Sequence, residues 1–336
     1  YIDSAYMYHG GESERFVGRA LKGYRDRVRV ATKLPTGMAK EHSDFDRLLN
    51  DQLSKLQVEY IDFYLFHGLN QKSWERVRDM GILPWAEGAM ADGRIHHLGF
   101  SFHDTTAALK SIIDDYDGWT FCQIQHNYMD INNQAGTEGL RYAAAKGLGV
   151  VIMEPILGGR LVNPPQQVKA IWDSAPVKRA PAEWALTWLW NQPEVSIVLS
   201  GMSTMQHVTE NIASAEKSSI GVLTAEDLAV VDKVRAAYEN LCPIPCTQCR
   251  YCMPCPNGVD IPRNFSTLNG GIMYDKLDDA RQGYNRWIPE DARASQCIQC
   301  RECEEKCPQS IPISEWMPVI QEVLGEGKSW DACALP

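Results

Sequence analysis

Cysteine is distributed very unevenly along this chain of 336 residues. Nine of its eleven cysteines lie between Cys242 and Cys307, and only Cys122 and Cys333 lie outside that interval. A secreted fold that depends on disulfides would spread its cysteines along the chain, whereas clustering at two-residue spacing is typical of metal ligation in a reducing compartment. We therefore expect a cytoplasmic protein with a metal-binding module near its C-terminal end.

The first two thirds of the chain alternate short apolar runs with amphipathic helical runs. Nearly continuous apolar strands are expected where both faces of a parallel sheet are buried, and strand–helix units of roughly 30 residues are typical of an α/β fold. The expected strands are residues 1–5, 28–34, 61–67, 96–102, 121–127, 149–156 and 196–201. The expected helices are residues 13–23, 44–56, 73–92, 105–116, 137–146, 181–191, 204–215, 225–240, 262–275 and 278–286, and a last one after residue 314.

Seven strands are one fewer than a (β/α)8 TIM barrel has. Because the sequence begins inside an apparent strand, we expect a first strand and helix to precede it. An open doubly wound sheet is the alternative, which is weakened because no G-x-G-x-x-G follows the early strands. Pro243 and Pro245 follow the helix that closes this region. We predict a TIM barrel over residues 1–240 and a mainly α-helical, ferredoxin-like domain over residues 241–336.

The charge balance excludes two classes of partner. The chain has 33 Lys and Arg against 43 Asp and Glu, which gives a net charge of −10. A broad nucleic-acid or anionic-membrane footprint would require the opposite sign. No apolar run approaches the ~20 residues of a membrane span.

Ionisable side chains stand at the ends of three consecutive expected strands. Asp3 and Tyr8 follow the first strand, Lys33 ends the second and His67 ends the third. In barrels of this type the active site lies at the carboxyl ends of the strands. A single Lys or His at such a place is more often structural than catalytic, but four complementary groups on neighbouring strands are rarely coincidental. We select these four as candidate catalytic residues.

This set resembles the active-site signature of the aldo-keto reductases. The matching stretches are DSAYMYHG at residues 3–10, ATK at 31–33 and FH at 66–67, and the resemblance covers residues 1 to about 215. It implies an NAD(P)H-dependent carbonyl reductase or alcohol dehydrogenase that acts on a small molecule.

The resemblance also implies a role for each of the four residues. Tyr8 would donate a proton to the alkoxide that hydride transfer forms. A free tyrosine has a pKa near 10, so this step needs assistance at neutral pH. Lys33 would stabilise the tyrosinate, Asp3 would hold Lys33, and His67 would hydrogen-bond to the substrate oxygen. The reducing power comes from the nicotinamide.

The match to the family's nucleotide contacts is less complete. Ser101 corresponds to a carboxamide-binding serine, but Phe102 replaces the asparagine that usually follows it, and Met153 stands where an aromatic residue usually stacks on nicotinamide. His207 stands where basic residues often bind the 2′-phosphate, so NADP and NAD both remain open. The candidate nucleotide-binding residues are Ser101, Gln123, Met153, Gly158, Gly159, Gly201, Ser203, His207, Glu210 and Asn211.

Two cysteine motifs follow each other in the last hundred residues. They read Cys246-x2-Cys249-x2-Cys252-x2-Cys255-Pro and Cys297-x2-Cys300-x2-Cys303-x3-Cys307-Pro. The second has the spacing of bacterial ferredoxins, and the first is one residue short before its last cysteine. In two-cluster ferredoxins the fourth cysteine of each motif binds the other cluster.

We therefore expect two [4Fe–4S] clusters with exchanged fourth ligands. The first set is Cys246, Cys249, Cys252 and Cys307, and the second set is Cys297, Cys300, Cys303 and Cys255. Cys255 is the least secure member because of the short spacing, with Cys242 as its substitute. Two zinc sites of four thiolates each are the alternative.

Barrel and cysteine module together resemble aldo-keto reductases fused to a dicluster ferredoxin domain. In one hypothesis the chain is a carbonyl reductase whose clusters are structural or regulatory. In a second, the clusters exchange electrons with a redox partner protein. In a third, the chain is a catalytically weak binding protein on the same fold.

Overall fold

A computed structural model describes residues 1–336, which separate into two compact units. The first unit comprises Tyr1–Gly158 and Ala182–Thr224, and the second comprises Gly159–Pro181 and Ala225–Pro336. None of the helices combines the length and the apolar character needed to cross a lipid bilayer.

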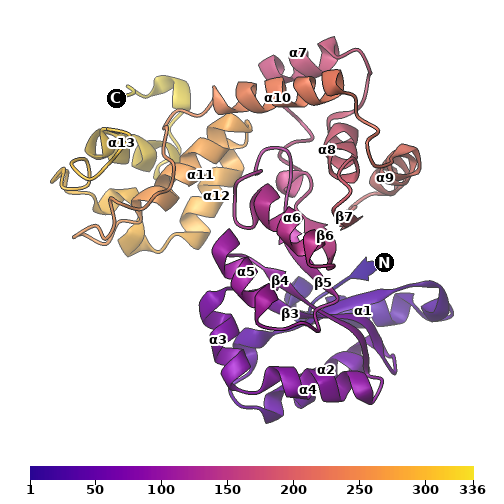
Figure 1. The fold of residues 1–336 in the computed structure, drawn as a ribbon. Helices are drawn as coiled ribbons and strands as arrows, with labels where there is room; N and C mark the ends of the chain where they lie inside the picture. The colour runs from indigo at the N-terminus through magenta and orange to yellow at the C-terminus, as the bar shows by residue number, and fades with distance from the viewer. The chain divides into compact units, whose positions relative to one another are not determined.

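The first unit is built on one sheet of seven parallel strands whose order follows the chain (Figure 1). Each strand pairs with the next along the sequence, as in a (β/α)8 barrel, and the predicted fold class is confirmed. The strands are β1 (Ile2–Asp3), β2 (Val30–Leu34), β3 (Ile61–Leu69), β4 (Ile95–Phe102), β5 (Phe121–Gln125), β6 (Gly149–Met153) and β7 (Val195–Val198). The helices between them are α1 (Ser13–Ala20), α2 (Ser43–Leu56), α3 (Gln71–Asp79), α4 (Ile82–Ala91), α5 (Thr106–Asp114), α6 (Gly136–Ala145), α8 (Pro181–Trp190) and α9 (Met205–Lys217).

Several predicted elements differ in extent from the observed ones, and for two of them the backbone shows the cause. The helix expected over residues 73–92 is divided into α3 and α4 at Gly81, whose φ of 81° lies in the left-handed region that favours glycine. The sixth strand ends at Met153 because the next residue, Glu154, has a φ of 53°. Residues beyond it form a turn instead of continuing the strand.

Aromatic side chains fill the space between the sheet and its helices. The buried Trp119 ring lies 5.5 Å from Phe66 of β3, 4.8 Å from Phe100 of β4 and 5.7 Å from Trp74 of α3. Its indole nitrogen donates a hydrogen bond to the carbonyl of Ile112 in α5 at 3.0 Å. Burial of such rings fixes α3 and α5 against β3 and β4.

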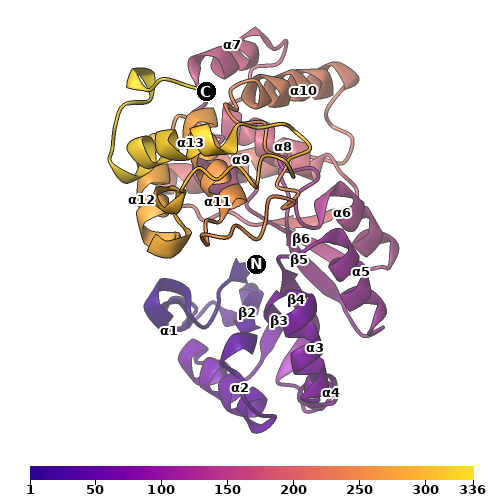
Figure 2. The same ribbon diagram turned by 90° about the vertical axis from the view of Figure 1, so that its left-hand side faces the viewer.

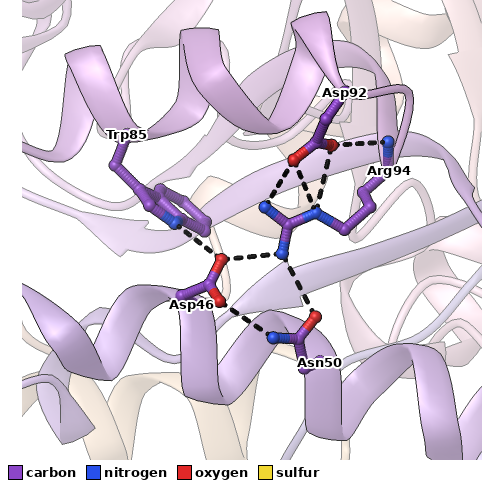
Figure 3. A network of polar contacts seen from close by, with 5 residues as sticks. All are labelled: Asp46, Asn50, Trp85, Asp92 and Arg94. Carbon is purple, nitrogen blue, oxygen red and sulfur yellow. Dashed lines mark hydrogen bonds and ion pairs between the residues drawn. The ribbon is translucent and has the colours of Figure 1, made fainter.

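A polar network connects two helices to the beginning of β4 (Figure 3). The Arg94 guanidinium, just before β4, donates to Asp92 after α4 and to Asp46 and Asn50 on α2, at 2.7, 2.7 and 3.1 Å. The Trp85 indole of α4 also approaches Asp46, at 3.5 Å. The guanidinium lowers the pKa of Asp46 and Asp92, so both carboxylates are charged at neutral pH.

The substitution Arg94→Gln is expected to lower the free energy of unfolding by about 1 kcal/mol at neutral pH, because partly exposed ion pairs contribute modestly. The folded-state pKa of both carboxylates lies below the unfolded value near 3.9. The stabilisation is therefore present above about pH 4 and lost as the pH falls further. Urea denaturation followed by circular dichroism should show the difference shrinking in acid, with Arg141→Gln as the control. A difference that is the same in acid would contradict this explanation.

The second unit is helical, as expected for residues 241–336. Its helices are α7 (Gln166–Ser174), α10 (Ala225–Glu239), α11 (Ile261–Met273), α12 (Leu277–Trp287) and α13 (Ile313–Ile320), and a π-helical turn follows at Gln321–Gly325. Figure 2 shows α11, α12 and α13 gathered together, and a core that includes Phe265, Tyr284 and Met317 lies among them. Helix α7, which was not predicted, packs against α10.

Candidate active site and cysteine clusters

Lys33 and Asp3 form a buried ion pair at the carboxyl ends of β1 and β2. The fully buried Lys33 ammonium donates to Asp3 Oδ1 at 2.5 Å and to the carbonyl of Ser4 at 2.7 Å. The second carboxylate oxygen of Asp3 accepts a hydrogen bond from Gln123 Nε2 on β5 at 3.0 Å. A buried charge is costly unless it is paired and hydrogen-bonded, so these contacts fix where the ammonium lies.

The Tyr8 phenol lies beside this ammonium. Its ring centroid is 4.8 Å from Lys33 Nζ and 5.9 Å from the His67 ring, in an edge-on arrangement. Tyr8 begins a turn in which His9, Gly10 and Gly11 all have positive φ. That turn requires residues that tolerate the left-handed region, and it directs a 37% exposed phenol to the strand ends. The structure thus brings together all four predicted catalytic residues.

His67 is an uncharged partner in this group. Burial, and then the positive charges of Lys33 and His103, lower the pKa of His67 to about 4. At neutral pH its ring therefore has one N–H donor and one acceptor nitrogen. His103, which follows β4, was not selected from the sequence because nothing in its local pattern distinguishes it.

A buried polar network next to Lys33 was also not predicted from the sequence. Glu14 Oε1 accepts hydrogen bonds from the hydroxyl of Thr32 and from Gln52 Nε2, both at 2.6 Å. Gln52 also donates to the backbone carbonyl of Lys33 at 3.0 Å and accepts from the Tyr64 hydroxyl at 2.7 Å. Burial raises the pKa of Glu14. Because Gln52 holds the backbone of Lys33, the network stabilises the strand that carries the ammonium.

Three predicted nucleotide contacts lie on neighbouring strands. Ser101 of β4 is opposite Gln123 of β5, and Met153 ends β6. The Ser101 hydroxyl accepts a hydrogen bond from the Gly68 amide at 2.8 Å. Gln123 Oε1 is buried and has no hydrogen-bond partner in the chain. Buried acceptors are nearly always satisfied, so this oxygen fits the amide donor of a nicotinamide carboxamide.

The remaining nucleotide candidates lie in two loops and on α9. Gly158 and Gly159 form a short turn with φ of 64° and 92°, and there is open space where a Cβ would stand. Exposed Gly201 and Ser203 precede α9, where Thr204 caps the amide of His207 at 3.2 Å. On α9 itself, Glu210 accepts from Gln206, and Asn211 donates to Ser200.

The structure gathers eight cysteines around two pockets. The first pocket is lined by Cys246, Cys249, Cys252 and Cys307. The second is lined by Cys255, Cys297, Cys300 and Cys303. These are the two predicted ligand sets, and each includes a fourth cysteine from the other motif. Cys249 and Cys300 are exposed, and the other six are half-buried.

The loops around the two pockets repeat the same conformation. Each has the pattern Cys-x-Gln-Cys-Arg-x-Cys, and Gln248, Arg250, Gln299 and Arg301 all have φ between 57° and 65°. Such values cost free energy for residues with a Cβ. Because both loops adopt these φ values at equivalent positions, we infer that each loop surrounds a group of similar size and shape.

The other three cysteines have different surroundings, and all eleven are free of disulfides. Cys242 lies near Cys246, but its sulfur contacts the carbonyl of Ile244 at 3.3 Å and does not line either pocket. Cys122 is buried in β5, where burial raises its pKa to about 12. Cys333 is half-buried in the C-terminal tail.

Comparisons with known proteins divide the chain into two regions. The aldo/keto reductase family model matches residues 1–236, and the 4Fe-4S dicluster domain model matches residues 245–311. L-galactose dehydrogenase of Arabidopsis thaliana is 25% identical over 263 residues, 72% of this chain and 81% of that protein. Methylglyoxal reductase YeaE of Escherichia coli is 25% identical over 247 residues, 70% of this chain and 80% of that protein.

Solved structures give the same result. Aldo-keto reductase AKR11C1 from Bacillus halodurans, in its holo form, is similar with a TM-score of 0.58 and 25% identity, covering 70% of this chain and 82% of that one. An aldo-keto reductase from Klebsiella pneumoniae in complex with NADPH has a TM-score of 0.55 and 25% identity, covering 70% and 79%. Fold and comparisons define a barrel oxidoreductase that carries an iron–sulfur domain. The chain belongs to the aldo/keto reductase family, whose members act on small carbonyl compounds.

His67 is expected to remain neutral at pH 6, because burial and nearby positive charge lower its pKa to about 4. Histidine-selective 15N NMR, with His67→Gln to assign its signals, should show no protonation of this ring between pH 8 and about pH 5. A midpoint near the ordinary value of about 6.5 would show that the ring is solvated instead.

Proposed function

We propose that the chain is an NAD(P)H-dependent carbonyl reductase, or alcohol dehydrogenase in the reverse direction, that carries two [4Fe–4S] clusters. The observation that carries the first part is the contact of Tyr8 with an ammonium that Asp3 holds in a buried position. We keep the proposed domain boundary between residues 240 and 241, which lies between the two matched family models, although α10 belongs to the second compact unit.

The chain's residues support the chemistry as follows. A reduced nicotinamide, when bound, supplies a hydride for the carbonyl carbon. The Tyr8 hydroxyl gives its proton to the carbonyl oxygen as negative charge develops there. The Lys33 ammonium stabilises the phenolate that remains, and Asp3 keeps the ammonium in place. The neutral His67 ring donates a hydrogen bond to the same oxygen. The product is an alcohol, and Tyr8 regains its proton from solvent.

The nucleotide assignment rests on Gln123 and on the loops. Gln123 Oε1 offers a buried, unused acceptor for the carboxamide, and Ser101 lies on the adjacent strand. The turn at Gly158 and Gly159 exposes backbone amides that suit phosphate groups. The similar Klebsiella pneumoniae enzyme was solved with NADPH. We include Met153, Gly201, Ser203, His207, Glu210 and Asn211 in the same proposed site.

The substitutions Lys33→Met and Tyr8→Phe are expected to lower kcat/KM by about 10²–10⁴-fold, because each removes a part of the proton donor. Methylglyoxal and L-galactose are suitable test substrates, because two of the relatives are named after them. Binding of NADPH, followed by its fluorescence, should change little, and Lys22→Met is the matched control. Full activity in either variant would exclude this mechanism.

For the clusters, Cys246, Cys249, Cys252 and Cys307 would hold one and Cys255, Cys297, Cys300 and Cys303 the other. Each set lines its own pocket, and no set of three donors is placed to hold a single metal ion. A zinc site would need four thiolates around one ion, so the geometry favours a cluster, which is larger than a single ion. Each cluster would supply one-electron chemistry or a rigid crosslink.

Anaerobic preparations are expected to contain about eight iron atoms per chain. Cys307→Ser should alter the EPR signal of the cluster bound by Cys246, Cys249 and Cys252, although Cys307 belongs to the other motif. Cys255→Ser should alter the other cluster, and Cys242→Ser is the control. If Cys242→Ser had the same effect as Cys255→Ser, the assignment of Cys255 as the fourth ligand would be contradicted.

A second candidate function is electron exchange with a redox partner protein. The observation in its favour is that both pockets have an exposed cysteine, Cys249 in one and Cys300 in the other. An exposed edge is what electron transfer between proteins requires. Reduction of the clusters by NADPH during turnover would support this function, whereas turnover that persists unchanged after cluster loss would exclude it.

A further inference from the structure

A cavity of about 400 Å³ lies on the surface of α11 and α12, within the second unit. Three of its lining side chains are cations, Arg160, Arg263 and Lys276, and one is an acid, Asp279. The cavity is separate from both cysteine pockets, which have other lining residues. Its size is in the range of small-molecule sites.

The three cations are not neutralised by the chain. None of them takes part in an ion pair or donates a hydrogen bond, and Arg160 only rests above the Tyr274 ring, at 5.9 Å. By contrast, three other arginines of the same unit form ion pairs, which are Arg235 with Asp232, Arg281 with Asp278 and Arg293 with Glu290. In a chain with a net charge of −10, three unpaired cations around one cavity are a local excess of positive charge.

Two glycines of α11 line this cavity. A Cβ at Gly271 of α11 would come within 2.8 Å of the Ala280 side chain, so the glycine allows α11 and α12 to approach closely. A Cβ at Gly270 would lie 3.5 Å from the Arg160 guanidinium, which shows that this group lies along α11 at that point. The indole of Trp287, which is 61% exposed, forms another part of the lining.

We propose that this cavity binds a small phosphate-bearing anion. Guanidinium groups donate paired hydrogen bonds to phosphate oxygens, and an ammonium adds a compact positive charge. Ser266 and Thr267 also line the cavity, but their hydroxyls already donate to the Arg263 carbonyl, so they offer acceptor oxygens and the cations must supply the donors. This inference does not depend on the proposed carbonyl chemistry.

Isothermal titration of the cluster-loaded chain with pyrophosphate tests the proposal. Arg263→Gln and Lys276→Gln should each weaken binding by about fivefold or more, since each removes one charge-assisted contact. Arg141→Gln and Lys233→Gln remove exposed cations elsewhere and should leave the affinity unchanged. Circular dichroism and the visible absorption of the clusters report whether each variant is intact.

Adenosine diphosphate, used as a second probe, distinguishes two sources of the phosphate. If adenosine diphosphate binds more tightly than pyrophosphate and Trp287→Leu abolishes this difference, the ligand is a nucleotide. If the two affinities are equal, the cavity recognises the phosphate groups alone. Pyrophosphate binding that is absent at millimolar concentration and low salt would overturn the proposal. The same holds for binding that is equally strong in Arg263→Gln, Lys276→Gln and the controls.

Discussion

The buried Lys33 ammonium is the interaction on which the candidate site depends. In a low-dielectric interior a charge of this kind is strongly unfavourable unless its partners are close and fixed. Asp3 is therefore a structural requirement as well as a chemical one, and Gln123 in turn holds Asp3 from β5. The partners come from three different strands, so the ion pair also constrains how their ends converge. The Tyr8 phenol lies beside this cation, where the proposed proton transfer would begin.

The backbone beneath the ammonium is held by a second set of buried polar groups. Gln52 connects the Lys33 carbonyl to Glu14 and Tyr64, so α1, α2 and β3 all contribute. Buried networks of this kind tend to specify one arrangement, because most alternatives leave more polar atoms unpaired. In this network Glu14 Oε2 is the buried atom without a hydrogen-bond partner. Rigidity at Lys33 thus originates partly from residues that cannot touch a substrate.

The sequence allowed the seven strands and the four strand-end residues to be predicted, because apolar periodicity and the position of a strand's end are local properties. It could not show that Glu14 and Gln52 are buried, since a polar residue on a helix gives no local sign of a partner on another element. The break at Gly81 was also not predicted, although the polar α3 gives way there to the mainly apolar α4. The contact of Gln123 with Asp3 joins residues 120 positions apart, which no local pattern encodes.

The cysteine spacing carried more information than any other pattern. Two-residue gaps leave a loop little conformational choice, and the left-handed residues Gln248, Arg250, Gln299 and Arg301 show how tightly both loops turn. Arginine occupies positions where glycine would be less strained. The repeat therefore places one cation beside each pocket at a cost to the backbone, as expected if positive charge is useful near an anionic cluster.

These two cations have unequal surroundings, which bears on what the clusters could do. Arg250 lies 3.7 Å from Asp260, whereas Arg301 has no such partner. Burial raises the pKa of Cys297 and Cys303, and the nearby Glu304 carboxylate adds to this effect. Negative charge near a cluster opposes the addition of an electron. If both pockets hold clusters as proposed, these different charged neighbours should give the two clusters different reduction potentials. A hydride carries two electrons and each cluster takes one, so unequal clusters would release two electrons in sequence and not together.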